Sequence, residues 1–394
     1  MGHIAGSKSS LVPLIDRLNK YPIGLVDNEK LREILSILFS EKEALIASKF
    51  PLEEATLPEL SRATKIDEDE LRPILETMAN KGLVMDMPYS GKTYYLLMPG
   101  LIGFMEFTFM RNRSDLPMKK LAELMLDYLR EPSENGMAGE FFGSKTQLTR
   151  SLVYEEHIPV TSHITSYESA MQIIKQTDFG AVTQCYCRHK KEHLGQKCKK
   201  NAPTEDFCIV LGSGARFLTR RGFAKRKTRR ELLAILERAR SLNLTHTTDN
   251  IRHKPSFICN CCRCCCELMQ GVQMGYHDGI AKTNYVAEID PEKCDYCGDC
   301  FTACNVKSIG LAKDREFKNK SDRYAAVYKE ICLGCAACIS SCEKGALTMI
   351  PRGNIQIPPY RKKNLFARIL WEKGRLTPFL ISRVKKAVRN LFSL

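Results

Sequence analysis

Apolar residues recur at helical spacing through the first hundred residues of the chain. One such set falls three or four positions apart, the period of a single helix face, and consists of Leu71, Ile74, Leu75 and Met78. Gly82 follows where this helix should end, because glycine tolerates the left-handed conformation that terminates helices. Helical segments precede this one and a hairpin pattern follows it. We therefore expect a helix-rich domain over residues 29–112, after an N-terminal arm at residues 1–28.

The order of these segments resembles a winged helix, in which helices precede a two-stranded wing. The turn of the wing would lie at "YSG", residues 89–91. A winged helix suggests DNA binding, but the helix that would enter the groove opens with "DEDE", residues 67–70, whose carboxylates DNA phosphates would repel. We therefore expect this domain to dock onto a protein rather than onto DNA.

A second amphipathic pattern lies at the C-terminal end of the sequence. Its apolar stripe follows Pro378 and consists of Leu380, Val384, Val388, Leu391 and Phe392. From Arg361 onward, ten Lys and Arg stand against a single acid, Glu372, so this segment holds much of the formal charge of +15. A basic amphipathic helix can lie on an anionic membrane surface or dock into a groove of a partner subunit. Both alternatives remain open.

The chain contains 18 cysteines among 394 residues. In a small secreted protein they would suggest disulfides, but the N-terminal "MGHIAGSKSSLVPL" lacks the apolar region and cleavage site of a signal peptide. No stretch of about 18 apolar residues occurs either. We therefore expect reduced thiols in a cytoplasmic protein, with peripheral contact on the inner face of the membrane as an option for the tail.

Eight of the cysteines form two runs with the same C-x2-C-x2-C-x3-C spacing. The first run, "CDYCGDCFTAC", contains Cys294, Cys297, Cys300 and Cys304. The second, "CLGCAACISSC", contains Cys332, Cys335, Cys338 and Cys342. Three thiolates at this spacing can bind one [4Fe-4S] cluster, while the fourth points toward a second cluster. The spacing predicts two [4Fe-4S] clusters, with Cys342 completing the first run and Cys304 completing the second.

The segment around these runs resembles the bacterial two-cluster ferredoxins. The resemblance covers roughly residues 285–350 and includes "NYVAEIDPEKC" before the first run and "GALTMI" after the second. It implies a ferredoxin-like module that carries single electrons. The proline that follows the fourth cysteine in that family is replaced here by Asn305 and Glu343. Proline is not a ligand, so ligation should survive, whereas the exposure and reduction potential of the clusters are left open.

Ten further cysteines precede the ferredoxin-like segment. Four of them lie between residues 185 and 208, namely Cys185, Cys187, Cys198 and Cys208. The other six lie in the octet "CNCCRCCC" and are Cys259, Cys261, Cys262, Cys264, Cys265 and Cys266. Side chains alternate along a strand, so Cys185 and Cys187 should share a face on an extended segment, as should Cys259 and Cys261. Cys262 and Cys264, or Cys264 and Cys266, could do the same.

These ten thiols could bind one or two further [4Fe-4S] clusters. Each of the two sets could supply its own cluster, or the two sets could converge on a single centre. Zinc is the alternative, with His189 and His193 beside Cys187 as additional candidates. Each histidine is expected to be solvated in a lysine-rich loop rather than to bind a metal. Buried free thiols are not a satisfactory alternative, because six in eight residues would be open to oxidation.

Residues 150–350 as a whole are similar to a group of anaerobic multi-cluster iron–sulfur proteins. No dinucleotide fingerprint, phosphate loop or catalytic triad occurs in the sequence. The expected function is therefore single-electron transfer to or from a redox partner protein in anaerobic metabolism, as a carrier or as an oxidoreductase subunit. Two alternatives are a redox-sensing winged-helix regulator, and an enzyme that binds its substrate at a cluster within residues 185–266.

The expected fold class is α+β with several domains, because 394 residues exceed what one core usually organises. The segments that follow the winged-helix-like domain are linker helices at 113–180, a cysteine-rich α/β region at 181–284, the ferredoxin-like module at 285–352, and a basic amphipathic tail at 353–394.

Overall fold

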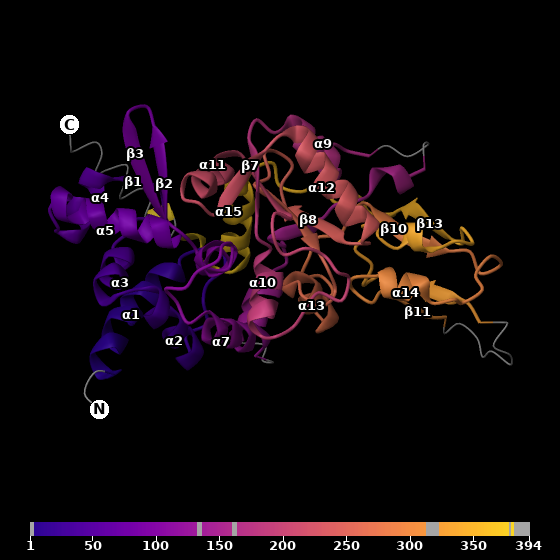
Figure 1. The fold of residues 1–394 in the computed structure, drawn as a ribbon, viewed down its shortest axis with the longest axis horizontal. Helices are drawn as coiled ribbons and strands as arrows, with labels where there is room; N and C mark the ends of the chain where they lie inside the picture. The colour runs from indigo at the N-terminus through magenta and orange to yellow at the C-terminus, as the bar shows by residue number, and fades with distance from the viewer. Residues whose placement is uncertain (1–3, 132–135, 160–163, 313–322, 378–379, 382–394) are drawn as a thin grey trace.

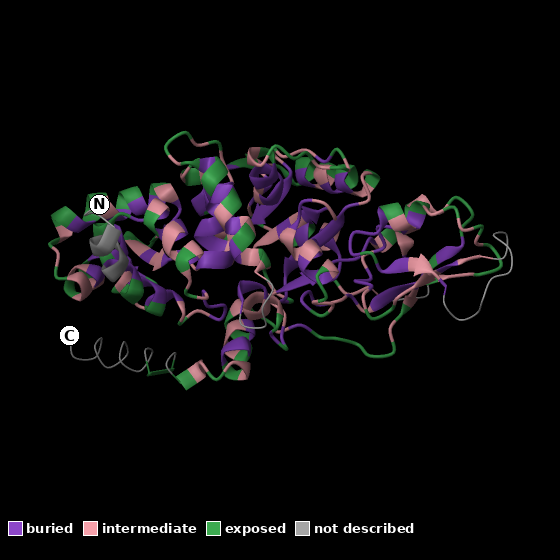
Figure 2. Cartoon of the chain, turned by 90° about the horizontal axis from the view of Figure 1, so that it is seen from below, coloured by how far each residue is buried: buried purple, intermediate pink, exposed green. Residues whose placement is uncertain are grey.

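The computed structural model describes residues 4–131, 136–159, 164–312, 323–377 and 380–381. The chain is elongated, with the N-terminal helices at one end and the strands β10 and β13 toward the other (Figure 1). Buried residues lie on the inward faces of the helices and in the central sheet, while exposed residues lie on the outward faces of the helices (Figure 2). Helices and strands are both well represented, which confirms the α+β class.

The N-terminal part consists of helices followed by a hairpin. Its elements are α1 (Ile4–Leu18), α2 (Glu29–Leu38), α3 (Glu41–Ser48), β1 (Ala55–Thr56), α4 (Leu57–Thr64), α5 (Glu68–Lys81), β2 (Val84–Tyr89) and β3 (Lys92–Leu97). Gly82 ends α5 in the left-handed conformation, with φ 81°, as its position after the apolar stripe predicted. The three strands form one antiparallel sheet in the order β1-β3-β2. Residues 1–28, expected as an arm, contribute α1, which packs against α3.

Short helices join this part to the centre of the molecule. They are η1 (Gly100–Phe104), α6 (Met105–Thr108), α7 (Met118–Arg130) and α8 (Met137–Phe142). Phe107 lies against Phe217 and Phe223 of the central part, with ring centroids 6.3 and 6.1 Å apart. These aromatic contacts join the two parts into one packed interior.

The centre is a six-stranded antiparallel sheet in the order β4-β8-β9-β6-β5-β7. The strands are β4 (Thr149–Ser151), β5 (Gly180–Thr183), β6 (Cys208–Leu211), β7 (Ala224–Lys227), β8 (Thr245–Asp249) and β9 (Phe257–Cys261). The helices around it are α9 (Ala170–Gln176), α10 (Tyr186–His193), α11 (Gly212–Arg220), α12 (Arg229–Ser241) and α13 (Glu267–Gln273). Residues 113–180, expected as linker helices, thus also supply a strand of this sheet.

The remaining elements carry the two cysteine runs and the C-terminal segment. They are η2 (Glu155–His157), β10 (Tyr285–Ile289), α14 (Asp299–Ala303), β11 (Ile309–Leu311), β12 (Ala325–Val327), η4 (Ile339–Ser341), β13 (Leu347–Pro351) and α15 (Lys362–Glu372). β10 pairs with β13, and β11 with β12, each antiparallel. Most of the apolar stripe expected in the tail, from Val384 to Phe392, lies outside the described residues. Among the described helices, none is long and apolar enough to span a bilayer.

Candidate metal centres

Four thiols converge at the turn between β9 and α13. The group, called here the four-thiol group, consists of Cys198, Cys262, Cys264 and Cys265, whose sulfurs all lie within 4.8 Å of one another. The Sγ of Cys198 lies 3.6 Å from that of Cys262 and 3.7 Å from that of Cys264. The backbone N–H of Lys199 donates to Cys264 Sγ at 3.3 Å. The octet therefore supplies three of these sulfurs and the segment after α10 supplies the fourth.

The spacing of the four-thiol group corresponds to a site for one metal ion. Four sulfurs about 2.3 Å from a tetrahedral ion are about 3.8 Å from one another, close to the distances observed here. In a cubane each cysteine binds a different iron, so the sulfurs must stand further apart. The group thus fits a tetrahedral ion without rearrangement, and a [4Fe-4S] cluster only after expansion.

The other six upstream thiols form a closed ring. In ring order they are Cys185, Cys187, Cys266, Cys261, Cys259 and Cys208. All six pack in one buried cluster, and each thiol lies close enough to the two beside it to shift their pKa values. Five of the six are buried and Cys259 is partly buried. We call this set the six-thiol ring. It draws three members from residues 185–208 and three from the octet.

The sequence-based grouping of these ten cysteines was therefore wrong. The thiols group neither by segment nor into a single set, because the four-thiol group and the six-thiol ring each take thiols from both segments. Alternation holds within β9, where Cys259 and Cys261 both face the ring. Beyond Cys261 the chain leaves the strand. Cys262 and Cys264, one of the two predicted pairs, still lie together, with Sγ atoms 3.6 Å apart, but in a turn and beside Cys265. The other predicted pair is separated, because Cys266 returns to the ring at the start of α13.

The expectation of an extended segment at Cys185 and Cys187 was also wrong. Cys185 is the extended N-cap of α10, and Cys187 already lies in the first turn of that helix. The two thiols still contact each other, because the N-cap and the first turn lie close together in space. Contact between these thiols therefore arises from a helix start rather than from strand alternation.

The first part of the lysine-rich stretch after Cys187 is a helix with a buried face rather than a solvated loop, whereas Lys197 and Lys199 beyond it are exposed as predicted. His189 is only 6% exposed, and its Nδ1 lies 2.8 Å from the carbonyl oxygen of Phe109. Lys190 is 1% exposed and forms an ion pair with Glu267, which also accepts a hydrogen bond from the hydroxyl of Tyr186. Burial lowers the pKa of Lys190 to about 8, although the charges of Cys187 and Glu106 act in the opposite direction. Solvation of His189 was thus wrongly expected.

Arg188 lies between the four-thiol group and the six-thiol ring. Its guanidinium donates hydrogen bonds to the carbonyl oxygens of Pro203, at 3.0 Å, and Asn260, at 2.6 Å. Burial by itself lowers the pKa of Arg188, but the negative charges of Cys185, Cys262, Cys208 and Cys198 together raise it. A buried positive charge between two sets of thiols stabilises their thiolate forms, which are the forms that bind metals.

The two ferredoxin-like runs are brought together in a crossed arrangement. Cys294, Cys297 and Cys300 line one small cavity together with Cys342 of the other run. Burial and the charges of Cys294, Cys297 and Cys342 raise the pKa of Cys300 to about 12. In the second set, burial raises the pKa of Cys335 to about 11, with the charges of Cys332 and Cys304 adding to it. Burial also raises the pKa of Cys338, and the charge of Cys304 raises it further. Each run is therefore close to the fourth cysteine of the other.

Residues that the sequence did not single out as site residues connect the runs to the central sheet. Asn305 Nδ2 donates to the carbonyl oxygen of Asn243 at 2.8 Å and to Thr245 Oγ1 at 3.0 Å, and its Oδ1 accepts from the N–H of Arg263 at 3.2 Å. Lys200 Nζ donates to the carbonyl oxygen of Ala303 at 2.9 Å. The replacement of the family's proline by Asn305 was the only sequence signal of this connection.

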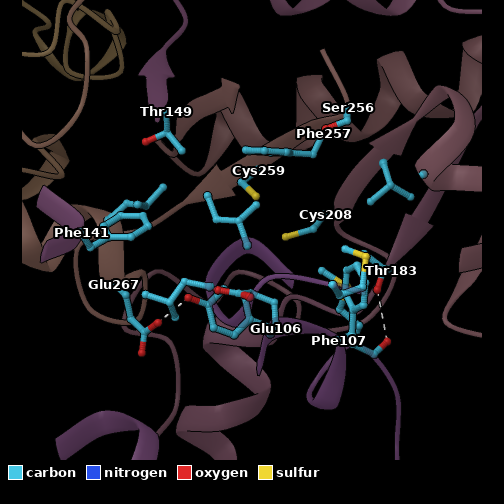
Figure 3. A pocket seen from close by; sticks show the side chains of 18 of the residues that line it. Glu106, Phe107, Phe141, Thr149, Thr183, Cys208, Ser256, Phe257, Cys259 and Glu267 are labelled. Carbon is cyan, nitrogen blue, oxygen red and sulfur yellow. Dashed lines mark hydrogen bonds between the residues drawn. The ribbon is translucent and has the colours of Figure 1, made fainter. Parts of the chain in front are cut away.

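A cavity of ≈ 260 Å³ lies where the N-terminal helices, the central sheet and α13 meet. Cys208 and Cys259 of the six-thiol ring stand in its wall, and Glu106 and Glu267 line another side (Figure 3). Burial raises the pKa of Glu106, whose Oε2 accepts a hydrogen bond from the N–H of Gly103 at 2.8 Å. The described part of the chain thus holds four sets of cysteines, and the larger of the two cysteine-lined cavities reaches the six-thiol ring. No protein-family model matches this chain, and no solved structure matches it.

Proposed function

We propose that this chain is an iron–sulfur protein that exchanges single electrons with a redox partner protein. The observation that carries the proposal is the crossed arrangement of the two runs, in which Cys342 joins the set of Cys294 and Cys304 joins the set of Cys332. Bound there, two [4Fe-4S] clusters would each supply one-electron redox chemistry. Cys294, Cys297, Cys300 and Cys342 would hold one cluster, and Cys332, Cys335, Cys338 and Cys304 the other.

The spacing of these two sets supports clusters rather than single ions. Among the residues that the structure describes, the four-thiol group is the one set of three or more ligands lying entirely within 4.8 Å. The sulfurs of the two runs stand further apart, as a cubane with one iron per cysteine requires. The same comparison favours a single zinc ion in the four-thiol group, because four thiolates at tetrahedral distances are a structural zinc site.

The exposure of the two sets gives them different roles. Cys297 is exposed, whereas Cys332, Cys338 and Cys304 are buried. The first set therefore lies at the surface, where a partner can approach it closely. The second set lies against the central sheet, since Thr245 Oγ1 donates to Cys335 Sγ at 3.4 Å. We infer that a partner exchanges electrons with the first set, on the side of Cys297. The second set would then exchange electrons with the interior of the protein.

The crossed assignment can be tested with two serine variants of the full-length chain. Cys342→Ser should alter the electron paramagnetic resonance signal of the cluster held by the first run, although residue 342 belongs to the second run. Cys304→Ser should alter the other signal. Asp69→Asn, an exposed residue of α5 outside all the cysteine sets, is the control and should leave both signals unchanged. The proposed function would be contradicted if each variant altered only the signal of the run to which its cysteine belongs. Absence of any signal from reduced wild-type protein would also contradict it.

A further inference from the structure

The six-thiol ring is too open for single metal ions. A tetrahedral ion needs three or four sulfurs that are all mutually close, as in the four-thiol group. Within the described part of the chain, no three ring thiols meet the 4.8 Å condition together. A two-zinc site with six cysteines would require two overlapping groups of four, so it does not fit this geometry either.

The ring is also too complete for one cubane. A [4Fe-4S] cluster uses about four cysteines, one for each iron, and would leave two ring members without a metal. Each ring thiol contacts two others in a closed circuit, so no pair stands apart as spare. Two closely packed thiols left free beside a redox centre would be open to oxidation. All six are therefore best explained as ligands, and neighbouring ring sulfurs would move apart when a cluster binds between them, as a cluster would also require in the four-thiol group.

The surroundings of the ring suit a negatively charged cluster. Thr247 Oγ1 hydrogen-bonds to Cys261 Sγ at 3.3 Å. The backbone N–H groups of Arg188 and Met269 lie close enough to Cys185 and Cys266 to lower the pKa of these thiols. The guanidinium of Arg188 adds a buried positive charge. Hydrogen bonds to cysteine sulfurs and nearby positive charge are the means by which proteins stabilise iron–sulfur clusters.

One edge of the ring is open to the cavity. Cys208 and Cys259 line it, whereas the other four ring members do not. The charged side chains of the wall already have partners. Glu106 accepts from Gly103, Glu267 pairs with Lys190, Arg130 hydrogen-bonds to Gln270, and Lys362 binds Ser256. The rest of the wall is mainly apolar, with residues such as Phe107, Phe141 and Leu268. A small uncharged molecule therefore fits this cavity better than an ion.

We propose that the six-thiol ring binds a single iron–sulfur cluster of more than four irons, and that the Cys208–Cys259 edge of this cluster is reached by a small uncharged ligand in the cavity. The closed ring supports the larger cluster, because it offers six thiolates where a [4Fe-4S] cluster binds about four. The partnered charges and the apolar wall carry the second part. The proposal does not depend on electron exchange by the ferredoxin-like sets, because both of its parts are tested at the ring.

The nuclearity is tested by metal analysis of variants at opposite sides of the ring. Cys187→Ala and Cys259→Ala, in anaerobically reconstituted full-length protein, should each lose the same irons, numbering more than about four, and retain the metal of the four-thiol group. Cys297→Ala, at a ferredoxin-like set, is the matched control and should lose about four irons at most. Equal iron in ring variants and wild type, or losses of about four, would overturn the proposal. If a ring variant fails to fold, Mössbauer spectra of the wild-type protein test the proposal instead. Spectra that show only [4Fe-4S] clusters would overturn it.

The open edge is tested with methyl isocyanide as an uncharged probe. In the wild type it should change the spectrum of the ring cluster and leave the ferredoxin-like signals as they were. Gly214 lines the cavity, and a Cβ atom there would meet no atom within 4 Å, so Gly214→Leu should extend into open space and fill part of the cavity. This variant should keep its metal content and lose the response at least tenfold, whereas Gly214→Ala should keep the response. A response of the ferredoxin-like signals alone, or an undiminished response in Gly214→Leu, would refute the open edge.

Discussion

Thr245 donates a hydrogen bond from its Oγ1 to the Sγ of Cys335, 3.4 Å away, although 90 residues separate them. In the sheet, Thr245 is also the register partner of Cys261, a member of the six-thiol ring. One residue of β8 therefore lies between the ferredoxin-like segment and the ring. Thr245 thus connects a ligand of a proposed cubane to the strand that pairs with a ligand of the proposed larger cluster.

Replacing Thr245 by valine should lower the reduction potential of the cluster that Cys335 holds. The hydroxyl donor stabilises negative charge on the sulfur, which increases on reduction. A hydrogen bond is worth about 0.5–1.5 kcal/mol, which for one electron corresponds to roughly 20–60 mV. A spectroscopic redox titration measures the change. Thr245→Ser keeps the donor and should keep the potential, so equal potentials in the valine and serine variants would argue against this role.

Replacing Asn305 by alanine should loosen the ferredoxin-like segment from the sheet. The side chain is 2% exposed and makes hydrogen bonds to Asn243, Thr245 and Arg263. Leaving these groups unpaired should cost about 2–3 kcal/mol of stability. Thermal unfolding of the reconstituted protein should show a lower midpoint for Asn305→Ala. The exposed Glu343, at the equivalent place after the other run, supplies the control, and Glu343→Ala should leave the midpoint nearly unchanged.

Acidic side chains beside Cys297 should favour a positively charged redox partner. Asp295 and Asp299 are exposed, and their charges act on this cysteine. Changing both to the corresponding amides should slow reduction by a cationic viologen roughly threefold at low salt, and the difference should vanish at high salt. Stopped-flow absorbance measures the rate. Asp69→Asn, on α5 at the other end of the molecule, is the control; an equal effect there would show that only net charge matters.

Asp86 should contribute stability that is lost in acid. Burial alone raises the pKa of this carboxyl, but hydrogen bonds from Arg221 and Arg220 lower it below its ordinary value. A lowered pKa in the folded chain stabilises it above the unfolded value of about 3.9, and this contribution disappears as the pH falls through the folded value. Asp86→Asn should therefore unfold more easily at pH 7, by about 1–2 kcal/mol after allowing for solvent screening.

The difference between this variant and the wild type should shrink as the pH falls below about 4, in thermal unfolding curves recorded at several pH values. A constant difference would contradict the ion-pair explanation. Asp86 lies in β2, whereas Arg220 and Arg221 lie at the C-terminal end of α11. Their ion pairs with Asp86 therefore hold the hairpin against the central part of the molecule. We accordingly expect no salt-sensitive binding of duplex DNA by the full-length protein, measured by fluorescence anisotropy.

The sequence predicted those features that depend on regular spacing. The stripe from Leu71 to Met78 and the break at Gly82 predicted α5, and alternation predicted that Cys259 and Cys261 face one side. Spacing could not reveal that the chain turns after Cys261 and brings Cys198 beside Cys262, because that contact joins residues 64 positions apart. Burial of His189 and Arg188 was hidden for the same reason. Their hydrophilic sequence neighbours indicate exposed side chains. The two residues are buried only because α10 packs against segments that are distant in the sequence.

The most direct test of this account is the content of iron, acid-labile sulfide and zinc in anaerobically purified, full-length protein. Two cubanes contribute about eight irons, and the ring should add more than four to them. We therefore expect more than about twelve irons per chain, comparable sulfide, and one zinc in the four-thiol group. About eight irons would leave the ring without its cluster. Zinc with little or no iron would contradict the central claim that the crossed cysteine runs carry electrons.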